Sequence, residues 1–276
     1  MTTRRGGRGS TARLPTAPGR RGPTIRRASA ASNRVRAVAA LVIVVCVVAL
    51  YGLTASSAFA YRRLALTGAT YTPEAEVTGA IRAELGRNLF TLSTGGMAER
   101  LRSLTTVRDA SVEVTLPDTL RVRLEERVPI VVWVVGDARF LIDKDRNAFA
   151  RDDGTKGLPV IDDRRVASSA LFIGSQVDAV DFDAATRLAS LRPADVGSGA
   201  AALGVTVDDD HGYVLDSGKD GWKATFGFYT PTIRRTDLIP GQVRLLRSLL
   251  AGREAKVATI LLADERNGTF TEKTAP

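Results

Sequence analysis

The residues best suited to chemistry lie together at one point of the chain, where Asp208, Asp209, Asp210 and His211 are consecutive. Carboxylates and an imidazole can bind divalent cations or exchange protons. The surrounding stretch, residues 203–217, alternates apolar and polar side chains on both sides of this run, which is typical of two strands joined by a turn. The chain contains one histidine, so no second imidazole can complete a metal centre. We therefore predict a solvated hairpin tip and no metal site.

A second acidic cluster has the spacing of a calcium loop. Asp143, Asp145 and Asn147 match the first three ligand positions of an EF-hand. That loop also requires a glycine at its sixth position and a bidentate glutamate at its twelfth, and these positions are Ala148 and Gly154 here. Because two required positions fail, we interpret the cluster as a turn between two strands.

Other catalytic and cofactor motifs are incomplete or missing in the sequence. Gly197-Ser198-Gly199 begins a dinucleotide-like G-x-G pattern, but Ala202 stands where the last glycine belongs. The sequence has no P-loop, HExxH or GxSxG pattern. Cys46 is the single cysteine, which excludes an internal disulfide and a cysteine-based zinc site. We predict that the chain is not an enzyme and has no cofactor, although a pair of carboxylates acting as in glycosidases stays open as an alternative.

The excess of positive charge belongs to the N-terminal tail. The formal charge of +9 and the pI near 10.2 at first suggest a nucleic-acid partner. Residues 1–36, however, hold ten arginines and no acidic residue, which leaves 29 basic residues against 30 acidic ones in the remainder. The tail lacks an apolar period and is predicted to be disordered. Its RRGGRG stretch, residues 4–9, resembles RNA-contacting segments, but attraction to anionic lipid is the simpler account, and we predict no nucleic-acid partner.

An uncharged run of 24 residues, from Ala37 to Ala60, follows the tail. A helix of this length reaches about 36 Å, which exceeds the roughly 30 Å of a bilayer core. We therefore predict one transmembrane helix at 37–60. The arginine excess before it predicts a cytoplasmic N-terminus and an extracytoplasmic C-terminal bulk in the cell membrane. A cleaved signal peptide is the alternative, because Ala58-Phe59-Ala60 fits the cleavage pattern, but the long apolar run and the 36 residues before it favour a retained anchor.

The part beyond this helix, residues 61–129, has the pattern of a small layered domain. Alternating apolar residues predict strands, and apolar residues four positions apart predict helices. The elements expected, in order, are a strand at 61–68, helices at 72–86 and 96–104, and strands at 107–116 and 119–125. This order predicts two helices on one face of a three-stranded sheet.

The same part carries a specific set of motifs. They are LTG followed by TPE, then GRNLFTLS at 86–93, and VRDASVEVTLPDTLRVRLEERVPI at 107–130. With these motifs, residues 61–129 resemble the POTRA domain of the FtsQ/DivIB family of bacterial cell-division proteins. The positions that match best are Val107, Ala110, Val112, Pro117, Thr119, Leu120, Val122, Glu126, Arg127 and Pro129. A short basic tail and one membrane span before the POTRA domain also resemble the family.

Residues 130–265 are predicted to form a second domain, followed by a C-terminal segment at 266–276. The elements expected are strands within 130–143, a helix at 183–191, a hairpin at 203–217, a strand at 221–229 and a helix at 239–252. Within 256–270, a strand is expected to run toward a turn at Asn267-Gly268. This part resembles the family by order of elements more than by residues. The predicted fold class is α+β: one N-terminal transmembrane helix, a POTRA domain (β-α-α-β-β), and a mostly antiparallel β domain with packed helices.

The family resemblance implies a non-enzymatic scaffold of the division machinery, located at the septum. It implies strand addition by coiled-coil partners of the FtsB/DivIC and FtsL types, and binding of other divisome components to the POTRA domain. The partner-binding residues that it implies are Leu261, Leu262, Ala263, Asp264, Glu265, Arg266, Asn267, Gly268, Thr269 and Phe270. We expect Leu262 and Thr269 to supply open backbone donors, unless this stretch is simply the last core strand.

Two other functional hypotheses stay open. The first is a membrane-anchored cell-wall hydrolase that uses residues 208–211. The second is a transmembrane regulator whose basic tail binds a cytoplasmic partner, which would require a foldable element that the tail sequence does not offer.

Overall fold

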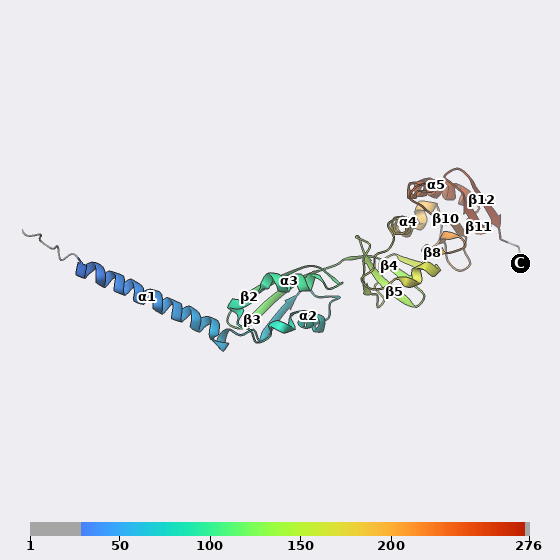
Figure 1. The fold of residues 1–276 in the computed structure, drawn as a ribbon. Coiled ribbons are helices and arrows are strands. Elements are labelled where there is room, and N and C mark those ends of the chain that lie inside the picture. Colours follow the sequence, from blue (N-terminus) through green and yellow to red (C-terminus); the bar gives the residue numbers. More distant parts are fainter. Residues whose placement is uncertain (1–28, 274–276) are drawn as a thin grey trace, which may run out of the picture. The chain divides into compact units, whose positions relative to one another are not determined.

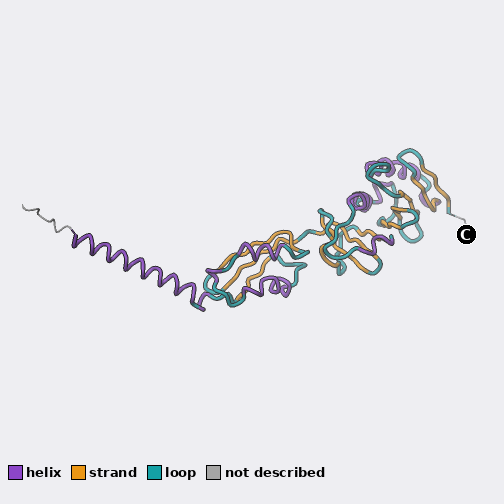
Figure 2. The backbone as a smooth tube through the Cα atoms, in the orientation of Figure 1, coloured by secondary structure: helices purple, strands orange, loops and turns teal. Residues whose placement is uncertain are grey.

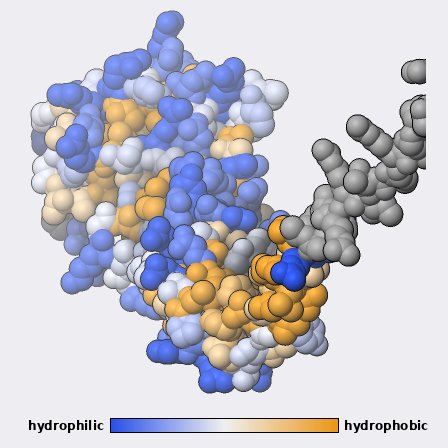
Figure 3. Space-filling view, turned by 90° about the vertical axis from the view of Figure 1, so that its left-hand side faces the viewer, coloured by the Kyte–Doolittle hydropathy of each residue, from blue (hydrophilic) through white to orange (hydrophobic). Residues whose placement is uncertain are grey.

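The computed structural model describes residues 29–273 and shows one long helix followed by a compact unit that begins at Ser56. The helix, α1 (Ser29–Ala55), contains a stretch, Asn33–Ala55, that is long and apolar enough to cross a membrane (Figure 1). Its apolar side chains are exposed, and they form part of the orange surface in Figure 3. This helix agrees with the predicted membrane span.

The bounds of α1 differ from the predicted ones at both ends. Residues 29–36, which we assigned to a disordered tail, are helical, and the helix ends at Ala55 and not at Ala60. The apolar run propagates helix into the flanking residues because each added turn extends an existing hydrogen-bond ladder. The remainder of the predicted tail, residues 1–28, lies outside the described residues.

Ser56 provides the local reason for the earlier end of the helix. Its hydroxyl accepts a hydrogen bond from the Ala58 N–H at 3.1 Å and caps a short 3-10 turn, Ser57–Phe59. Ala60 is buried and forms a bridge with Asn88. Ala60 therefore belongs to the domain that follows and not to the membrane helix.

The first domain has the predicted order of strand, helix, helix, strand, strand. Its elements are β1 (Arg63–Thr67), α2 (Glu74–Ile81), α3 (Thr94–Arg102), β2 (Val107–Thr115) and β3 (Thr119–Glu126). The sheet has the order β1-β3-β2, with β1 parallel and β2 antiparallel to β3. The helices pack on the sheet through a small core whose buried residues include Val77, Ile81, Met97, Leu101, Leu120 and Val122.

One carboxylate holds the end of β3 to the segment before α2. Glu126 accepts hydrogen bonds from the N–H groups of Thr70, Tyr71 and Thr72, and from the Thr72 hydroxyl at 2.6 Å. Burial alone would raise the pKa of Glu126, but these hydrogen bonds hold it below its ordinary value. The ionised carboxylate thus holds in place a loop between β1 and α2 that belongs to no strand pair of the sheet.

The second domain is built on a nine-stranded sheet with the order β12-β11-β10-β9-β8-β7-β4-β5-β6. Figure 2 shows strands in orange and helices in purple along the backbone. The strands are β4 (Pro129–Val135), β5 (Ala138–Asp143), β6 (Ala148–Arg151), β7 (Val160–Asp163), β8 (Gly204–Asp208), β9 (Gly212–Asp216), β10 (Lys223–Gly227), β11 (Val257–Leu262) and β12 (Gly268–Glu272). Antiparallel neighbours prevail among the described strand pairs, as predicted. Two of the parallel pairs are joined through helices, α4 (Ala179–Ala189) between β7 and β8, and α5 (Ile239–Leu250) between β10 and β11.

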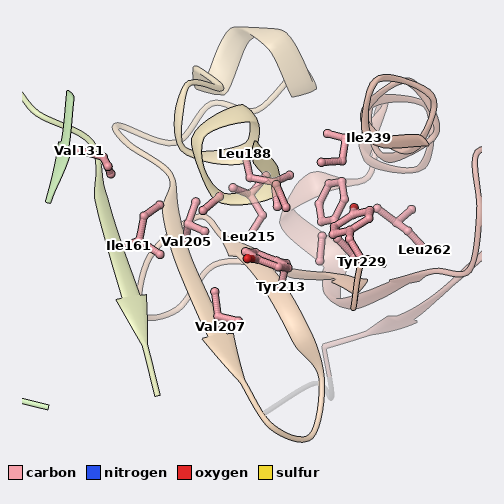
Figure 4. Close-up of a cluster of buried hydrophobic side chains, with 14 of the residues drawn as sticks. Val131, Ile161, Leu188, Val205, Val207, Tyr213, Leu215, Tyr229, Ile239 and Leu262 are labelled. Carbon is pink, nitrogen blue, oxygen red and sulfur yellow. The ribbon is translucent and has the colours of Figure 1, made fainter. Parts of the chain in front are cut away.

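Both helices lie on one face of this sheet, where they close the main core (Figure 4). Leu188 of α4 and Ile239 of α5 pack with Tyr213, Leu215 and Leu262 of the strands. The residues that alternate with these core positions point to the opposite face, which is partly or fully exposed between β8 and β12. Between β8 and β12, one face of the sheet is therefore a core and the other is a surface, whereas at β4–β6 the opposite face carries a second buried cluster, formed by Val132, Leu141, Phe149 and Ala150.

Replacing Glu126 with glutamine should destabilise the first domain by about 1–3 kcal/mol at pH 7, because buried donors lose a charged acceptor. The measurement is the unfolding midpoint of the full chain in detergent micelles, followed by circular dichroism. Since the folded-state pKa of Glu126 is depressed, its contribution is present above the ordinary glutamate pKa of about 4.3 and is lost as the pH falls below it. The difference between the wild type and Glu126→Gln should therefore shrink in acid.

The matched control is Glu125→Gln, which changes an exposed neighbour on the same strand. This variant should unfold like the wild type at both pH values. Equal destabilisation by the two substitutions would contradict the role given to the Glu126 carboxylate.

Candidate functional site at the C-terminal sheet edge

The two end strands of the nine-stranded sheet differ in what covers their outer backbone groups. At β6, the Ala148 N–H donates to the Ser175 carbonyl at 2.9 Å, and the Ala148 carbonyl accepts from the Gly174 N–H at 2.7 Å. The start of the β6 edge is therefore paired with a loop. At the other end, β12 pairs with β11 alone among the described strands. The open edge of the sheet is β12.

The pairing of β12 with β11 determines which of its backbone groups point outward. The Ala263 N–H donates to the Asn267 carbonyl at 2.9 Å, and the ladder continues from that pair. In an antiparallel ladder every second residue directs its N–H and C=O to the neighbouring strand. Thr269, two residues after Asn267, therefore faces β11. The outward-facing residues of β12 are Gly268, Phe270 and Glu272.

The turn before β12 is fixed by Asp264. Its carboxylate accepts hydrogen bonds from the N–H groups of Arg266 and Asn267, both at 2.7 Å, and from the Asn267 side-chain amide at 2.7 Å. These bonds, that of the Asn267 amide first, lower the pKa of Asp264 below its ordinary value. The turn therefore sets the position at which β12 begins.

The end of β11 is anchored from the helix side of the sheet. Gln242 of α5 is fully buried and donates to the Leu262 carbonyl at 3.1 Å, while its own oxygen accepts from the Tyr229 hydroxyl at 2.8 Å. Arg234 donates to the same Leu262 carbonyl at 2.9 Å and to the carbonyl of Ala263. These side chains hold β11 in place while its partner β12 stays at the edge.

Two glycines allow α5 to approach the hairpin closely. A Cβ atom at Gly241 would lie 2.4 Å from the Cβ of Glu265, and one at Gly268 would lie 3.1 Å from a side chain of α5. Phe270 also packs toward this side, and the Arg253 guanidinium lies 5.1 Å from its ring centroid. The inner face of β12 is thus held against the helix, and its outer backbone stays open.

The structure distributes the ten predicted partner-binding residues over a hairpin. Leu261 and Leu262 end β11, residues 263–267 form the turn, and residues 268–270 begin β12. The expectation that Leu262 and Thr269 supply open donors is wrong, because Leu262 lies in an interior strand and Thr269 faces β11. The strand predicted from residue 256 ends at Leu262, before the predicted turn at Asn267-Gly268. The bound predicted for the second domain, residue 265, is also wrong, because β12 belongs to the same sheet.

Three residues beyond the predicted range extend the edge. Thr271 lies opposite Thr259, with 2.5 Å between their hydroxyl oxygens, and Glu272 and Lys273 follow it. The sequence carries a signal for this strand, because the predicted Asn-Gly turn at 267–268 precedes the alternating residues T-F-T-E. A hairpin assignment at that turn identifies β12.

A shallow hollow of about 790 Å³ lies on the uncovered face beside β12. One row of side chains crosses its floor in register, formed by Thr206, Val214, Thr225, Leu261 and Thr269. Charged side chains surround this row, among them Arg164, Asp208, Asp216, Lys219 and Lys223. Threonines interleaved with apolar residues offer a surface for another chain's side chains.

The acidic hairpin tip joins β8 and β9, and ligand atoms of Asp208, Asp210 and His211 lie within 4.8 Å of one another. Asp208 already accepts the N–H groups of Asp210, at 3.0 Å, and of His211, at 2.6 Å. Burial would raise the pKa of Asp208, but the bonds from His211 hold it below its ordinary value. Asp209 accepts the Val166 N–H at 2.9 Å. Two of these carboxylates thus stabilise loops.

The second acidic cluster also serves a turn. Asp143 accepts hydrogen bonds from the N–H groups of Asp145, at 2.9 Å, and Asn147, at 2.8 Å, and from the Arg127 guanidinium at 2.6 Å. Burial would raise the pKa of Asp143, but Asn147 and Arg127 hold it below its ordinary value. The cluster forms the turn between β5 and β6, as we predicted because two positions that a calcium loop requires are absent.

Asp163 shows that a buried carboxylate in this domain is a structural acceptor. It is 1% exposed and accepts hydrogen bonds from Trp133 Nε1 at 3.0 Å, the Ser168 hydroxyl at 2.6 Å and the Arg165 guanidinium at 2.8 Å. Burial would raise the pKa of Asp163, but Arg165 and Ser168 hold it low. With its acceptor positions occupied, it is poorly placed to take a proton from a substrate.

Replacing Gln242 with leucine should lower the unfolding free energy of the second domain by about 1–3 kcal/mol, because the buried Tyr229 hydroxyl loses its acceptor. Amide hydrogen exchange in β11 and β12 should accelerate, since one of the anchors of Leu262 is lost. Arg244→Gln, an exposed change on the same helix, is the control and should leave both measurements unchanged. A Gln242→Leu chain that unfolds and exchanges like the wild type would refute the anchoring role.

Comparison with known families identifies the type of the first domain. The model of the POTRA domain, FtsQ-type, matches residues 59–127. The match contains β1, β2, β3 and both helices between them. It begins at Phe59, in agreement with the finding that Ala60 belongs to this domain.

Similar proteins include several that are named cell division protein FtsQ. That of Mycobacteroides abscessus is 35% identical over 101 residues, which cover 37% of this chain and 33% of that protein. That of Mycobacterium tuberculosis is 33% identical over 114 residues, which cover 41% of this chain and 35% of that protein. The chain thus matches about a third of the length of these relatives. Residues 59–127 form an FtsQ-type POTRA domain after a helix able to cross a membrane, and the resemblance of this chain to the FtsQ/DivIB family is confirmed.

Proposed function

We propose that the chain is a non-enzymatic scaffold of the bacterial division machinery, anchored by α1 and binding its partners outside the cytoplasm. The observation that carries the proposal is the difference between the two ends of the large sheet, since a loop pairs with the start of β6 and no described strand pairs with the outer side of β12. The FtsQ-type POTRA domain and the similarity to cell division proteins support a role in division.

Strand addition is the binding mode that this edge favours. Three outward-facing residues on β12, at alternate positions, offer a row of donors and acceptors to an extended partner segment of about five residues. The partners that the resemblance suggests are coiled-coil proteins of the FtsB/DivIC and FtsL types. Side chains of such a segment would lie beside Leu261 and Thr269 on the open face and beside Phe270 on the other.

The state of the acidic residues supports a non-enzymatic role. Among the described residues, Asp143, Asp163 and Asp208 each accept two or more hydrogen bonds from the protein itself. A general acid or base must exchange its proton with a substrate, and carboxylates used in this way to hold turns are poorly suited to that. This argues against the hydrolase alternative.

The anchor and the tail complete the proposal. The arginines of residues 1–36 favour a cytoplasmic N-terminus and attraction to anionic lipid, at about 1 kcal/mol per basic residue near the surface. The domains after α1 would then work on the extracytoplasmic side at the septum. Other divisome components would bind the POTRA domain.

Replacing Glu272 with proline should weaken binding of an FtsB/DivIC-type partner about tenfold, because proline removes an outward N–H and leaves the β11 side of the ladder unchanged. Co-purification of the full chain with the partner, followed by a titration in detergent, measures this. Glu272→Ala keeps the N–H and is the matched control, with little expected loss.

The pair Phe270→Pro and Phe270→Ala repeats this test two residues earlier on the same edge. Loss of the ring is common to both variants, so the difference between them reports the N–H alone. Proline variants that bind like their alanine controls, with unchanged circular dichroism, would exclude strand addition at β12.

A fluorescent fusion of the full chain should concentrate at midcell during division. Exchange of residues 1–36 for an unrelated basic tail should preserve this pattern, since the proposal requires only that the tail be positively charged. Uniform membrane fluorescence of the wild type would contradict the scaffold proposal, and loss of function on tail exchange would favour the regulator.

A further inference from the structure

The POTRA sheet has one end at which three separate segments meet. β1 begins at Arg63 and pairs in parallel with β3, with Arg63 opposite Thr119, so the β2–β3 turn lies at the same end as the start of β1. The loop before α3 is tied there as well, because the Tyr61 N–H donates to the Arg87 carbonyl at 2.8 Å. We call these segments, residues 56–63, 85–92 and 116–118, the proximal end.

Large apolar side chains are exposed at the proximal end. Leu85, Phe90 and Leu116 are 62%, 49% and 51% exposed. The ring of Phe90 packs edge-to-face with that of Phe59, at 5.2 Å between centroids, so the two rings form a pair that no core covers. Single exposed apolar residues are common, but three on one end of a small domain indicate a contact surface.

The charge of the proximal end is positive. Arg62, Arg63 and Arg87 are exposed. The two carboxylates nearby are already paired, Asp118 with Arg63 at 2.9 Å and Glu84 with Arg87. Arg62 donates to the Ser57 carbonyl at 3.3 Å and is recorded in no ion pair among the described residues. The surface thus combines apolar side chains with cationic ones.

The chain itself determines what this surface can reach. α1 ends at Ala55, and Ala60 is already part of the POTRA domain. A chain of five residue steps spans at most about 17 Å, and a 3-10 turn within it shortens that reach. The headgroup layer of a bilayer is roughly 5–8 Å thick on each side. If α1 spans the membrane, the linker keeps the proximal end within about 17 Å of the end of α1, which is close enough for it to reach the headgroups.

We propose that the proximal end docks on the surface of an anionic bilayer. Leu85, Phe90 and Leu116 enter the interfacial layer, and the arginines face lipid phosphates. Aromatic and arginine side chains suit this layer because each has an apolar body and a group that prefers water or phosphate. Docking fixes the orientation of the POTRA domain against the membrane.

The experiment uses the full chain with Cys46→Ser in nanodiscs made of phosphatidylcholine and phosphatidylglycerol at 3:1. A single cysteine replaces Leu85 and carries a bimane fluorophore, and the lipids include one with a nitroxide quencher at its headgroup. The control places the same label at Val128, an exposed apolar residue just beyond the other end of β3. Quenching at position 85 should be at least threefold stronger than at 128.

Further variants separate docking from simple tethering. The pair Phe90→Ser and Leu116→Ser should halve quenching at position 85, while Val166→Ser with Phe172→Ser, two exposed sites in the second domain, should leave it unchanged. Arg62→Ala, a surface change, should reduce the difference between anionic discs and pure phosphatidylcholine discs.

Three outcomes would overturn the proposal. Equal quenching at 85 and 128 would show that the proximal end is not at the surface. Quenching at position 85 that is unchanged in the serine variants would show that the short connection to α1 alone brings the label near the lipid. Protection of the label that rises with the number of chains per disc, without quenching by lipid, would identify a second copy of the chain as the occupant.

Discussion

The parallel pairing of β10 with β11 is the constraint on which the open edge depends. Parallel neighbours require the chain to cross the sheet between them, and α5 makes this crossing. The crossing places Gln242 directly behind the Leu262 carbonyl, with Arg234 bonded to the same group. Since β10 and the helix hold β11 from two sides, the strand that follows can only take the outer position. The open edge is therefore a consequence of the topology.

An open sheet edge can cause aggregation, because its unpaired N–H and C=O groups can pair with a strand of another copy of the protein. The chain limits this danger at β12 in several ways. The strand has five residues, Glu272 places a charge among its outward-facing residues, and the ladder shifts register between Val257 and Thr259. These features oppose pairing of β12 with a second copy, and the proposed partner segment would need side chains that fit the adjoining surface.

The sequence was most informative where local pattern decides the structure. Alternation and helical spacing predicted the order of the POTRA elements, and the failed EF-hand positions predicted a turn at Asp143. Errors arose where a single side chain competes with the pattern. Ser56 ends the membrane helix early by capping a new turn, and Asp178 starts α4 before the predicted residue 183 by accepting the Val180 N–H at 2.8 Å. The identity of the edge strand depends on which strands pair, and the local spacing of residues does not determine that pairing.

β3 connects the two ends of the POTRA domain and gives the arrangement a mechanical consequence. It pairs with β1 along the whole of β1, and only Arg127 and Val128 separate it from β4 of the second domain. Glu126 ties the end of β3 to the segment before α2, so that end cannot fray without breaking charged hydrogen bonds. One strand, held at both of its ends, therefore leads from the start of β1 to within two residues of the large sheet. The proposed scaffold role would benefit from this property, since an edge can select a partner only if its position is defined.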